Sequence, residues 1–295
     1  MQPVWSRVGC AFRVLRCAPA TTTQSPRRRG EKRSDRRAGN TQATPYDMIR
    51  AVLRALWQLL GWIELIALTA VMYILSFMPK PRLGDWYRRL FGVWSRAWVH
   101  ALGVDLRLHH KNRKPLPDRF IMIANHPSSF EDVGIPALFD VDSLAKIEVR
   151  DWWLAGRIGA AAGTIFVKRE SRESRAAAAR QIREHLARGR NVALYPEGGI
   201  NGPRLQPMFR RGAFGISLET GVPIVPVYLH YEAIHDFHWG RHSLLANLRN
   251  IMLARNNRAN YYVFDAIEPH LFHDKEGYCD HVYRLYLEWQ ARYLD

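Results

Sequence analysis

Hydrophobic residues are most concentrated between Ala55 and Met78, a run of 24 residues in which Gln58 and Glu64 are the strongly polar interruptions. As a helix this run would be about 36 Å long, enough to cross the ~30 Å hydrocarbon layer of a bilayer. Pro79 and Pro81 predict its end. The pattern predicts a membrane-associated helix; the alternative, a core helix of a soluble domain, seldom has an apolar run beyond about 18 residues.

A second helix is predicted from about Asp85 to Leu102. Apolar side chains recur at every fourth position and basic ones lie between them, which is typical of an interfacial amphipathic helix with tryptophan at headgroup depth; the apolar positions are Trp86, Leu90, Trp94, Trp98 and Leu102. Basic residues flank the first helix on both sides, so both of its ends are predicted to face the cytoplasm. A monotopic or re-entrant hairpin satisfies both flanks, while Glu64 makes a clean span costly.

From Arg119 onward, short β-rich apolar runs alternate with helical patterns. This alternation predicts an α/β fold, with a central mixed sheet flanked by helices, after an N-terminal membrane-associated helical pair. We expect strands at Phe120–Ala124, Ser143–Ile147, Thr164–Val167, Val192–Tyr195, Ile224–Leu229 and Tyr261–Phe264, and helices at Glu173–Arg188, Phe209–Glu219 and Gly277–Tyr293. The expected organisation is a basic tail over 1–47, the helices over 48–105 and the α/β domain over 106–295.

The charge distribution changes the interpretation of the first residues. The chain has 295 residues and a net charge of +16, but residues 1–45 alone carry ten basic and two acidic side chains. This tail is too polar to fold alone. It resembles a transit peptide in composition, but we favour the interpretation that Met48 begins the functional chain. Nucleic-acid binding is disfavoured because no binding motif accompanies the charge, and three cysteines exclude a disulfide framework.

Candidate chemistry lies where the predicted strands end. The first block is Asn125-His126-Pro127-Ser128, with Glu131 and Asp132 shortly after it. A carboxylate that holds one imidazole nitrogen leaves the other free to accept a proton. Either acid can fill this role. In the alternative interpretation, Ser128 and Glu131 form a helix capping box, and Asp132 is the partner of the histidine.

Three further blocks follow later strands. Lys168 and Arg169 stand at the end of an apolar strand, where they are suited to holding a phosphate. Glu197, Gly198 and Gly199 follow another strand, and their glycines permit close approach of the backbone to a ligand. The strand in Val222–Val227 contains two prolines, which predict a sheet edge or a bulge. No metal site is predicted, because the spacing of His235, His238 and His242 fits no common zinc pattern.

Taken together and in this order, the four blocks resemble the glycerolipid acyltransferase superfamily, typified by 1-acylglycerol-3-phosphate acyltransferases. The resemblance covers about Trp57 to Val227 and includes the N-terminal helices. It implies that His126 is the general base, that an acid orients it, and that Arg169 is associated with the acceptor's phosphate. The other substrate-binding residues that it implies are Asn125, Ser128, Lys168, Glu197, Gly198, Gly199, Arg210 and Arg211.

Two positions depart from the family pattern. The family's acid follows the histidine after four residues, and here Glu131 fills that position with Asp132 next to it. The third motif usually continues with Thr and Arg, but here Gly199 and Ile200 follow. One phosphate ligand is thereby lost, and Arg204, Arg210 or Arg211 is the candidate replacement.

The resemblance implies direct transfer of a fatty acyl group from acyl-CoA or acyl carrier protein to a lysophospholipid hydroxyl, with no other cofactor and no covalent enzyme intermediate. The expected acceptor is 1-acylglycerol-3-phosphate, a lyso-ornithine lipid being the alternative. The expected location is the cytoplasmic face of a bacterial inner membrane, with membrane lipid as a partner; the pattern favours no particular oligomeric state. A catalytically inactive lipid-binding relative is the competing class, suggested by the Glu131 departure.

Overall fold

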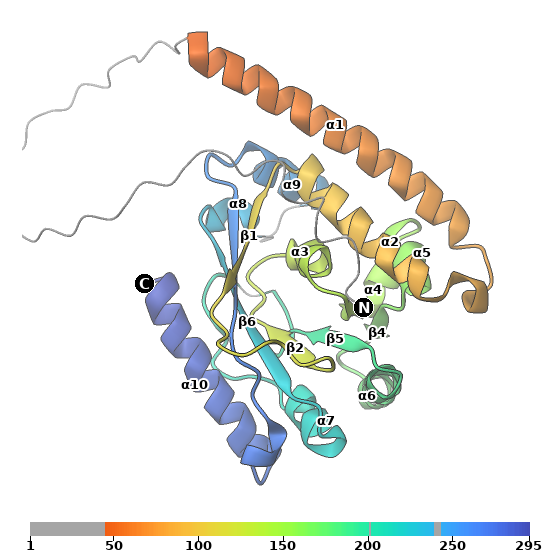
Figure 1. Cartoon of the computed structure of the whole chain (residues 1–295), viewed down its shortest axis with the longest axis vertical. Coiled ribbons are helices and arrows are strands. Elements are labelled where there is room, and N and C mark those ends of the chain that lie inside the picture. Colours follow the sequence, from red (N-terminus) through yellow and green to blue (C-terminus); the bar gives the residue numbers. More distant parts are fainter. Residues whose placement is uncertain (1–44, 201, 239–242) are drawn as a thin grey trace, which may run out of the picture. The chain divides into compact units, whose positions relative to one another are not determined.

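A mixed sheet of seven strands organises the computed structural model, which describes residues 45–200, 202–238 and 243–295 (Figure 1). The strand order is β1-β7-β6-β2-β5-β3-β4. Five strands run parallel to one another, while β7 is antiparallel to β6 and parallel to β1. The strands are β1 (Asp105–His110), β2 (Ile121–Ala124), β3 (Val141–Lys146), β4 (Ile165–Val167), β5 (Asn191–Leu194), β6 (Ile224–Tyr231) and β7 (Arg258–Val263). The predicted α/β class with a central mixed sheet is confirmed.

Helices cover both faces of the sheet and precede it. They are α1 (Pro45–Leu75), α2 (Lys80–Ala101), α3 (Glu131–Leu138), α4 (Ile147–Arg150), α5 (Ala155–Ala162), α6 (Arg172–Ala187), α7 (Gly212–Thr220), α8 (Ile234–Phe237), α9 (Leu244–Leu253), the 3₁₀ turn η2 (Pro269–Leu271) and α10 (Lys275–Tyr293). One core packs α6, α7 and α10 against one face of the sheet. The other core packs α3, α9 and the end of α2 against the opposite face.

The six predicted strands are all present, and a seventh was not expected. Strand β1 gave little signal, because only Leu106 and Leu108 alternate with polar residues there, on a half-buried edge strand. The proline-containing strand β6 is central rather than an edge, since it pairs with both β2 and β7; the alternative, a bulge, is found, because the pairing shifts by one residue between Ile224–Ile267 and Val227–Val263. Pairing with β7 begins at Val227, one residue after Pro226, so the missing proline N–H lies outside that ladder.

The carboxyl end of β2 and the middle of β6 are held by a side chain from the last helix. The buried Tyr286 hydroxyl of α10 lies 2.8 Å from the carbonyl oxygen of Ile123 and 3.1 Å from that of Val227. It also accepts a hydrogen bond from the Val227 N–H at 3.2 Å. The two strands are therefore bridged by a phenol at the point where β2 leads into the His126 segment.

Helices α1 and α2 form an antiparallel hairpin packed on the α/β domain (Figure 1). Gly84 interrupts α2 with a φ of 49°, so the regular helix begins at Asp85, as predicted. Gly61 of α1 allows close approach, because a Cβ there would lie 2.8 Å from the Ala101 nitrogen. Glu64, which is costly in lipid, lies 3.2 Å from His100 of α2, so its charge has a partner within the hairpin.

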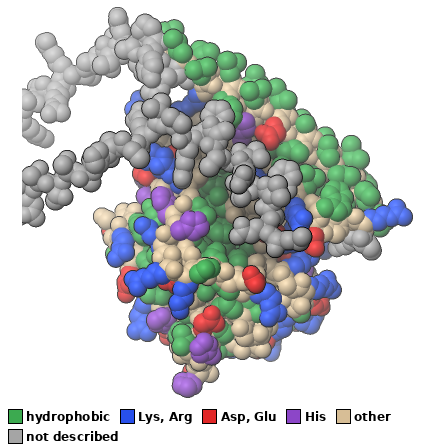
Figure 2. All heavy atoms as spheres, viewed as in Figure 1, with side chains coloured by type: hydrophobic (Ala, Val, Ile, Leu, Met, Phe, Trp, Pro, Cys, Tyr) green, Lys and Arg blue, Asp and Glu red, His purple; other side chains and the backbone are tan. Residues whose placement is uncertain are grey.

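Most of the tryptophan stripe of α2 is packed inside the protein, contrary to expectation, and only Trp86 at its start is exposed. Trp94 of α2 is 6% exposed and packs with side chains of α1 and α5. Its indole N–H donates to the Thr69 hydroxyl at 2.8 Å. The exposed apolar surface belongs instead to α1, and Figure 2 shows hydrophobic side chains along its length. Within the described residues, Val52–Leu75 is the one helical segment that is long and apolar enough to cross a membrane, and only 17% of its apolar window is buried.

The expected basic tail falls almost entirely outside the described residues. Helix α1 begins at Pro45, slightly before the expected boundary at residue 48. At the other expected boundary, β1 begins at Asp105 and belongs to the sheet.

Candidate active site

Asn125 fixes the start of the segment that carries His126. Strand β2 ends at Ala124, and the Asn125 side chain then replaces a strand residue: its Nδ2 donates to the Leu229 carbonyl at 2.9 Å, and its Oδ1 accepts from the Leu229 N–H at 2.7 Å. Both bonds are buried. The side-chain amide thus extends the ladder of β6 by one step while the main chain turns away, which places His126 at the carboxyl edge of the sheet. Asn125, predicted to bind substrate, has a structural role in this arrangement.

Glu131 lies beside His126 and also performs the capping interaction. Its Oε2 is 3.7 Å from His126 Nδ1, and its Oε1 accepts from the Ser128 N–H at 2.8 Å. The two alternatives for Glu131 are therefore compatible, since each uses a different carboxylate oxygen. His126 and Glu131 are both buried, and neither Nδ1 nor Oε2 has another hydrogen-bond partner. Asp132 is exposed and forms no ion pair with His126 among the described residues.

Ser128 anchors the loop between β2 and α3. Its hydroxyl donates to the Phe237 carbonyl at 2.6 Å and accepts from the Phe130 N–H at 3.1 Å. The side chain is fully buried. Both bonds go to the backbone, so Ser128 shapes the His126 loop and has no hydroxyl hydrogen left for a substrate.

Glu197 ties the third motif to the first. One of its oxygens accepts from the His126 N–H at 2.7 Å, and the other accepts from the Gln206 N–H at 2.9 Å. The carboxylate is 8% exposed. Predicted as a substrate ligand, Glu197 holds the histidine backbone in the structure.

Tyr195 is a site residue that sequence reasoning did not single out. Its ring stacks on the His126 imidazole with a centroid distance of 4.1 Å and an angle of 9° between the planes. Its hydroxyl is buried and has no hydrogen-bond partner in the described structure. The one available signal was its position at the end of β5, next to the strand that ends before His126.

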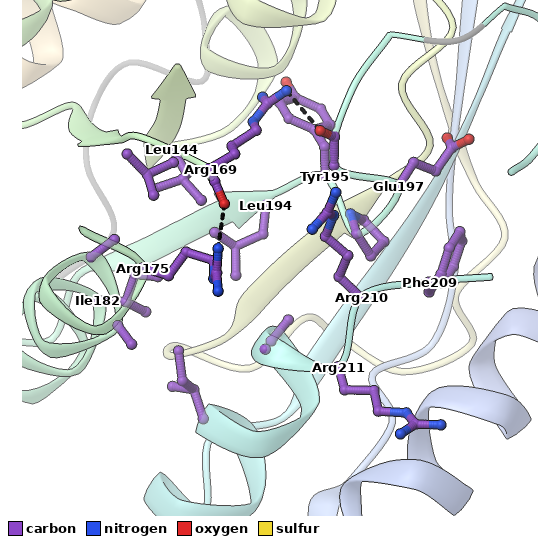
Figure 3. Close-up of a pocket in the computed structure, with 18 of the residues that line it drawn as sticks. Leu144, Arg169, Arg175, Ile182, Leu194, Tyr195, Glu197, Phe209, Arg210 and Arg211 are labelled. Atoms are coloured by element: carbon purple, nitrogen blue, oxygen red, sulfur yellow. Dashed lines mark hydrogen bonds between the residues drawn. The ribbon is translucent and has the colours of Figure 1, made fainter. Parts of the chain in front are cut away.

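A pair of cations, Arg169 and Arg210, lies near Tyr195 at the end of β5 (Figure 3). The guanidinium of Arg169, which follows β4, donates to the Gly198 carbonyl at 2.7 Å. Gly198 has a φ of 76°, and a Cβ at this position would collide with the Arg210 side chain. Gly198 therefore brings both arginines to the end of β5. Neither guanidinium forms an ion pair in the described part of the chain.

The other predicted cations are arranged differently. Lys168 is exposed and does not line the cavity beside Arg169. Arg211 extends toward α10, where it pairs with Glu276 at 3.2 Å (Figure 3). Arg204 pairs with Asp295 at 2.5 Å. Gly199 follows Gly198 at the edge of the site. Of the three candidate replacements for the missing arginine of the third motif, Arg210 is the one that stands next to Arg169.

Arg169 and Arg210 line a cavity of about 1020 Å³ between α6, α7 and the end of β5. Arg175, Arg211 and Glu197 also line it, and Tyr195 lies in its wall. The apolar lining includes Leu144, Val167, Ala178, Ile182, Leu194, Phe209 and Ile216. A cavity with cationic and apolar lining suits a molecule that has an anionic group and a hydrocarbon chain.

Burial sets the protonation of the central pair. Loss of solvent lowers the pKa of His126 because the charged imidazolium is disfavoured; Asp132 opposes this shift and Arg169 reinforces it. Burial also raises the pKa of Glu131 well above its ordinary value, against the hydrogen bond that it accepts from the Ser128 N–H. A neutral histidine at neutral pH is the state that can accept a proton.

The segment between β1 and β6 matches the Acyltransferase family model, over residues 105–230. The chain is 32% identical to the lyso-ornithine lipid O-acyltransferase of Pseudomonas aeruginosa, over 62% of this chain and 70% of that protein. It is also 32% identical to a 1-acyl-sn-glycerol-3-phosphate acyltransferase of Neisseria gonorrhoeae, over 39% of this chain and 45% of that one.

The fold is shared with a solved structure. The crystal structure of the 1-acyl-sn-glycerophosphate (LPA) acyltransferase of Thermotoga maritima aligns with a TM-score of 0.57 at 20% identity, over 81% of this chain and 93% of that one. The motifs, the architecture and the extent of the relationship to the Pseudomonas protein agree. The chain therefore belongs to the glycerolipid acyltransferase superfamily and is an acyltransferase.

Proposed function

We propose that this protein transfers a fatty acyl group from a thioester donor, acyl-CoA or acyl carrier protein, to the hydroxyl of a lysolipid with an anionic headgroup, and that the acceptor is 1-acylglycerol-3-phosphate. The observation that carries the proposal is that the His126–Glu131 pair lies beside Tyr195 at the end of β5, where Arg169 and Arg210 meet at Gly198 and form no ion pair in the described residues. A phosphate monoester carries close to two negative charges and matches two adjacent guanidinium groups.

In the proposed reaction, Glu131 lies toward Nδ1 of His126, and the other ring nitrogen takes the proton of the acceptor hydroxyl. The hydroxyl oxygen forms a bond to the thioester carbonyl carbon, the carbon–sulfur bond breaks, and the proton passes from the imidazolium to the departing thiolate. General-base assistance of this kind contributes roughly 10²–10⁴-fold in rate. No enzyme nucleophile is required. The Ser128 hydroxyl is committed to Phe237, and Cys279 is buried.

A lyso-ornithine lipid is the second candidate acceptor. Three relatives with this name, from Pseudomonas aeruginosa, Brucella abortus and Rhizobium meliloti, each match 62% of the chain. Ile200 in place of the third-motif arginine also removes a phosphate ligand. The carboxylate of such an acceptor has only one negative charge to place against Arg169 and Arg210.

The test is a direct comparison of acceptors. Purified protein is given acyl-CoA or acyl carrier protein thioester with either lysolipid, and both free thiol and acylated product are followed. Thiol release that depends on 1-acylglycerol-3-phosphate and yields phosphatidic acid supports the proposal. Thiol release that depends on the ornithine acceptor alone would show that a lyso-ornithine lipid is the acceptor. Release without any acceptor indicates a thioesterase and contradicts acyl transfer.

We propose further that the protein acts at the cytoplasmic face of a bacterial inner membrane. The exposed apolar side of α1 and the hydrophobic acceptor support a membrane location. The thioester donor is a cytoplasmic metabolite, which favours that face. Fractionation of cells with the α1–α2 hairpin intact or deleted (residues 45–103) tests this location.

A further inference from the structure

The turn between α4 and α5 exposes two adjacent tryptophans at the same edge of the sheet as His126. Trp152 is 41% exposed and Trp153 is 72% exposed. Helix α4 follows directly from β3, which is parallel to β5 and β2, so the turn stands at the edge where those strands end. Glu148 of α4 is close enough to Arg169 for each to shift the other's pKa. The tryptophans are therefore neighbours of the candidate active site and are not part of it.

The backbone of this turn is held by hydrogen bonds and by close packing at Gly156. The Trp152 N–H donates to the Val149 carbonyl at 3.2 Å, and the Gly156 N–H donates to the Trp152 carbonyl at 2.8 Å. Gly156 is buried, and a Cβ there would collide with the Arg150 carbonyl, so only glycine lets α5 start this close to α4. Because the backbone is fixed, the two indoles cannot fold back into the protein core. Their exposure is built into the turn.

Three contacts join the turn to the end of α1. The ring of Trp153 meets that of Tyr73 edge to face at a centroid distance of 5.6 Å. Arg157 donates to Ser76 at 3.0 Å, and its guanidinium lies 3.6 Å from the centre of the Phe77 ring. The exposed indoles therefore continue the apolar surface of α1, which also exposes Ile74 and Phe77.

The side chains around this surface indicate what it contacts. Arg150 and Arg157 are exposed beside the indoles, together with one acid, Asp151, and Trp86 at the start of α2 is 43% exposed. Indole rings next to basic side chains are the usual composition of a protein surface at the headgroup level of an anionic bilayer. The exposed face of α1 has the length and apolarity of a membrane-inserted helix. A contiguous apolar surface of this extent is seldom left in water.

We propose that Trp152 and Trp153 form a second membrane contact, in which the α/β domain itself inserts its α4–α5 turn into the interface of an anionic phospholipid bilayer. If the α1–α2 hairpin were the one membrane contact, the protein could tilt relative to the bilayer. The second contact holds the carboxyl edge of the sheet against the bilayer, so that a lysolipid moves from the membrane toward Arg169 and His126 without crossing bulk water. This role rests on the proposed function, but the membrane contact itself does not.

The contact is tested with an environment-sensitive label on the full chain. Cys10 and Cys17 are changed to serine; Cys279 is retained because its thiol is buried and burial raises its pKa to about 11. A nitrobenzoxadiazole label is placed at Trp153→Cys or, as the control, at Leu287→Cys on the exposed side of α10, which lies far from α1 (Figure 1). Vesicles of phosphatidylethanolamine and phosphatidylglycerol, with and without doxyl-labelled lipid, are added, and flotation establishes that both proteins bind.

At position 153 we expect a blue-shifted emission that doxyl lipid quenches, and at position 287 no change. An unquenched, aqueous label at position 153 on vesicle-bound protein overturns the proposal and directs attention to a protein partner for the two indoles. This readout needs no catalysis, so it stands even if neither lysolipid is a substrate.

Kinetics supply the second measurement. The variant W152S/W153S should lose about tenfold or more in kcat/KM for long-chain lysolipid presented in vesicles, because two interfacial anchors are removed. It should keep its rate on a short-chain acceptor dissolved in water. L287S should keep both rates. Equal losses on both acceptors would mean that the turn supports the active site internally, and would contradict the membrane contact.

Discussion

Glu131 spans the gap between Ser128 and His126 with its two carboxylate oxygens, at 2.8 Å from the Ser128 nitrogen and 3.7 Å from the His126 ring nitrogen. The helix cap and the proposed catalytic pair are thus parts of one interaction. The cap fixes the carboxylate, and the fixed carboxylate faces the imidazole. This geometry predicts how the two neighbouring acids differ.

Glu131→Gln should lower kcat by about 10²-fold or more, with little change in thermal stability. The amide oxygen of glutamine can still accept from Ser128, but an NH₂ group, which cannot accept from the ring, replaces the oxygen that faces His126 Nδ1. Asp132→Asn is the matched control and should cost much less. Steady-state kinetics with thermal unfolding of both variants decide the assignment: a full rate in Glu131→Gln with a large loss in Asp132→Asn would assign the orienting role to Asp132.

The pH dependence of kcat/KM should report the His126 environment. Because burial lowers the His126 pKa, the acid limb of the wild-type profile should lie below pH 6.5. Asp132 favours the imidazolium and Arg169 disfavours it. Asp132→Asn should therefore move the limb to lower pH, and Arg169→Ala should move it to higher pH. Shifts in the same direction, or none, would show that another group controls the limb.

Arg169→Ala and Arg210→Ala should each raise the KM for the lysolipid by about tenfold or more while leaving the KM for the thioester nearly unchanged. Each removes one of the two cations that meet at Gly198. Lys168→Ala and Arg211→Ala are the controls, since Lys168 is exposed outside the cavity and Arg211 is paired with Glu276. If all four variants behave alike, headgroup recognition is not located at Gly198.

Gly198→Ala should impair acceptor binding more than a surface glycine change would. An alanine at a φ of 76° costs about 1–2 kcal/mol, and its methyl group would displace the Arg210 side chain. We expect a raised acceptor KM, together with a lower melting temperature. Gly189→Ala is the matched control, because Gly189 also has a positive φ, 75°, but has open space around its Cβ position. A normal acceptor KM in Gly198→Ala would show that the position of the Arg210 side chain does not contribute to acceptor binding.

The sequence predicted the sheet and the motifs more completely than it predicted the roles of individual residues. Apolar runs identified six strands because most of their residues are buried or half-buried, β2 along its whole length, whereas β1 has only Leu106 and Leu108 as a signal. Three motif residues expected at the substrate, Asn125, Ser128 and Glu197, have side chains that bond to the protein backbone, and the Gly198 carbonyl accepts from the Arg169 side chain. Each of these partners lies more than 25 residues away, and no local pattern reveals such partners.

The tryptophans also show that sequence patterns do not reveal tertiary partners. Periodicity placed Trp94 on the apolar face of α2, and that face turned out to pack against α1 and α5. Trp152 and Trp153 lie in a short turn without periodicity, so only the packing of Tyr73 and Arg157 shows that they continue the surface of α1.

Tyr286→Phe should destabilise the protein by about 1–3 kcal/mol, because it leaves the buried Val227 N–H without its hydrogen-bond acceptor. Urea unfolding measures the loss. Tyr283→Phe is the control, since its hydroxyl is only partly buried and bonds to Gln206 at the domain surface. Equal, small effects of the two changes would mean that the phenol does not fix β2.

The Tyr286 bridge also orders events during synthesis. The strand that leads to His126 is fixed by a hydroxyl 163 positions later in the chain, whereas α1 leaves the ribosome more than 200 residues before α10. Chains emerge from the amino terminus at about 5–20 residues per second. The apolar hairpin is therefore available to a bilayer roughly ten seconds or more before Tyr286 can bridge β2 and β6. With the proposed membrane location, the nascent chain would reach the bilayer before its proposed active site is complete, and activity would begin only when the last helix docks.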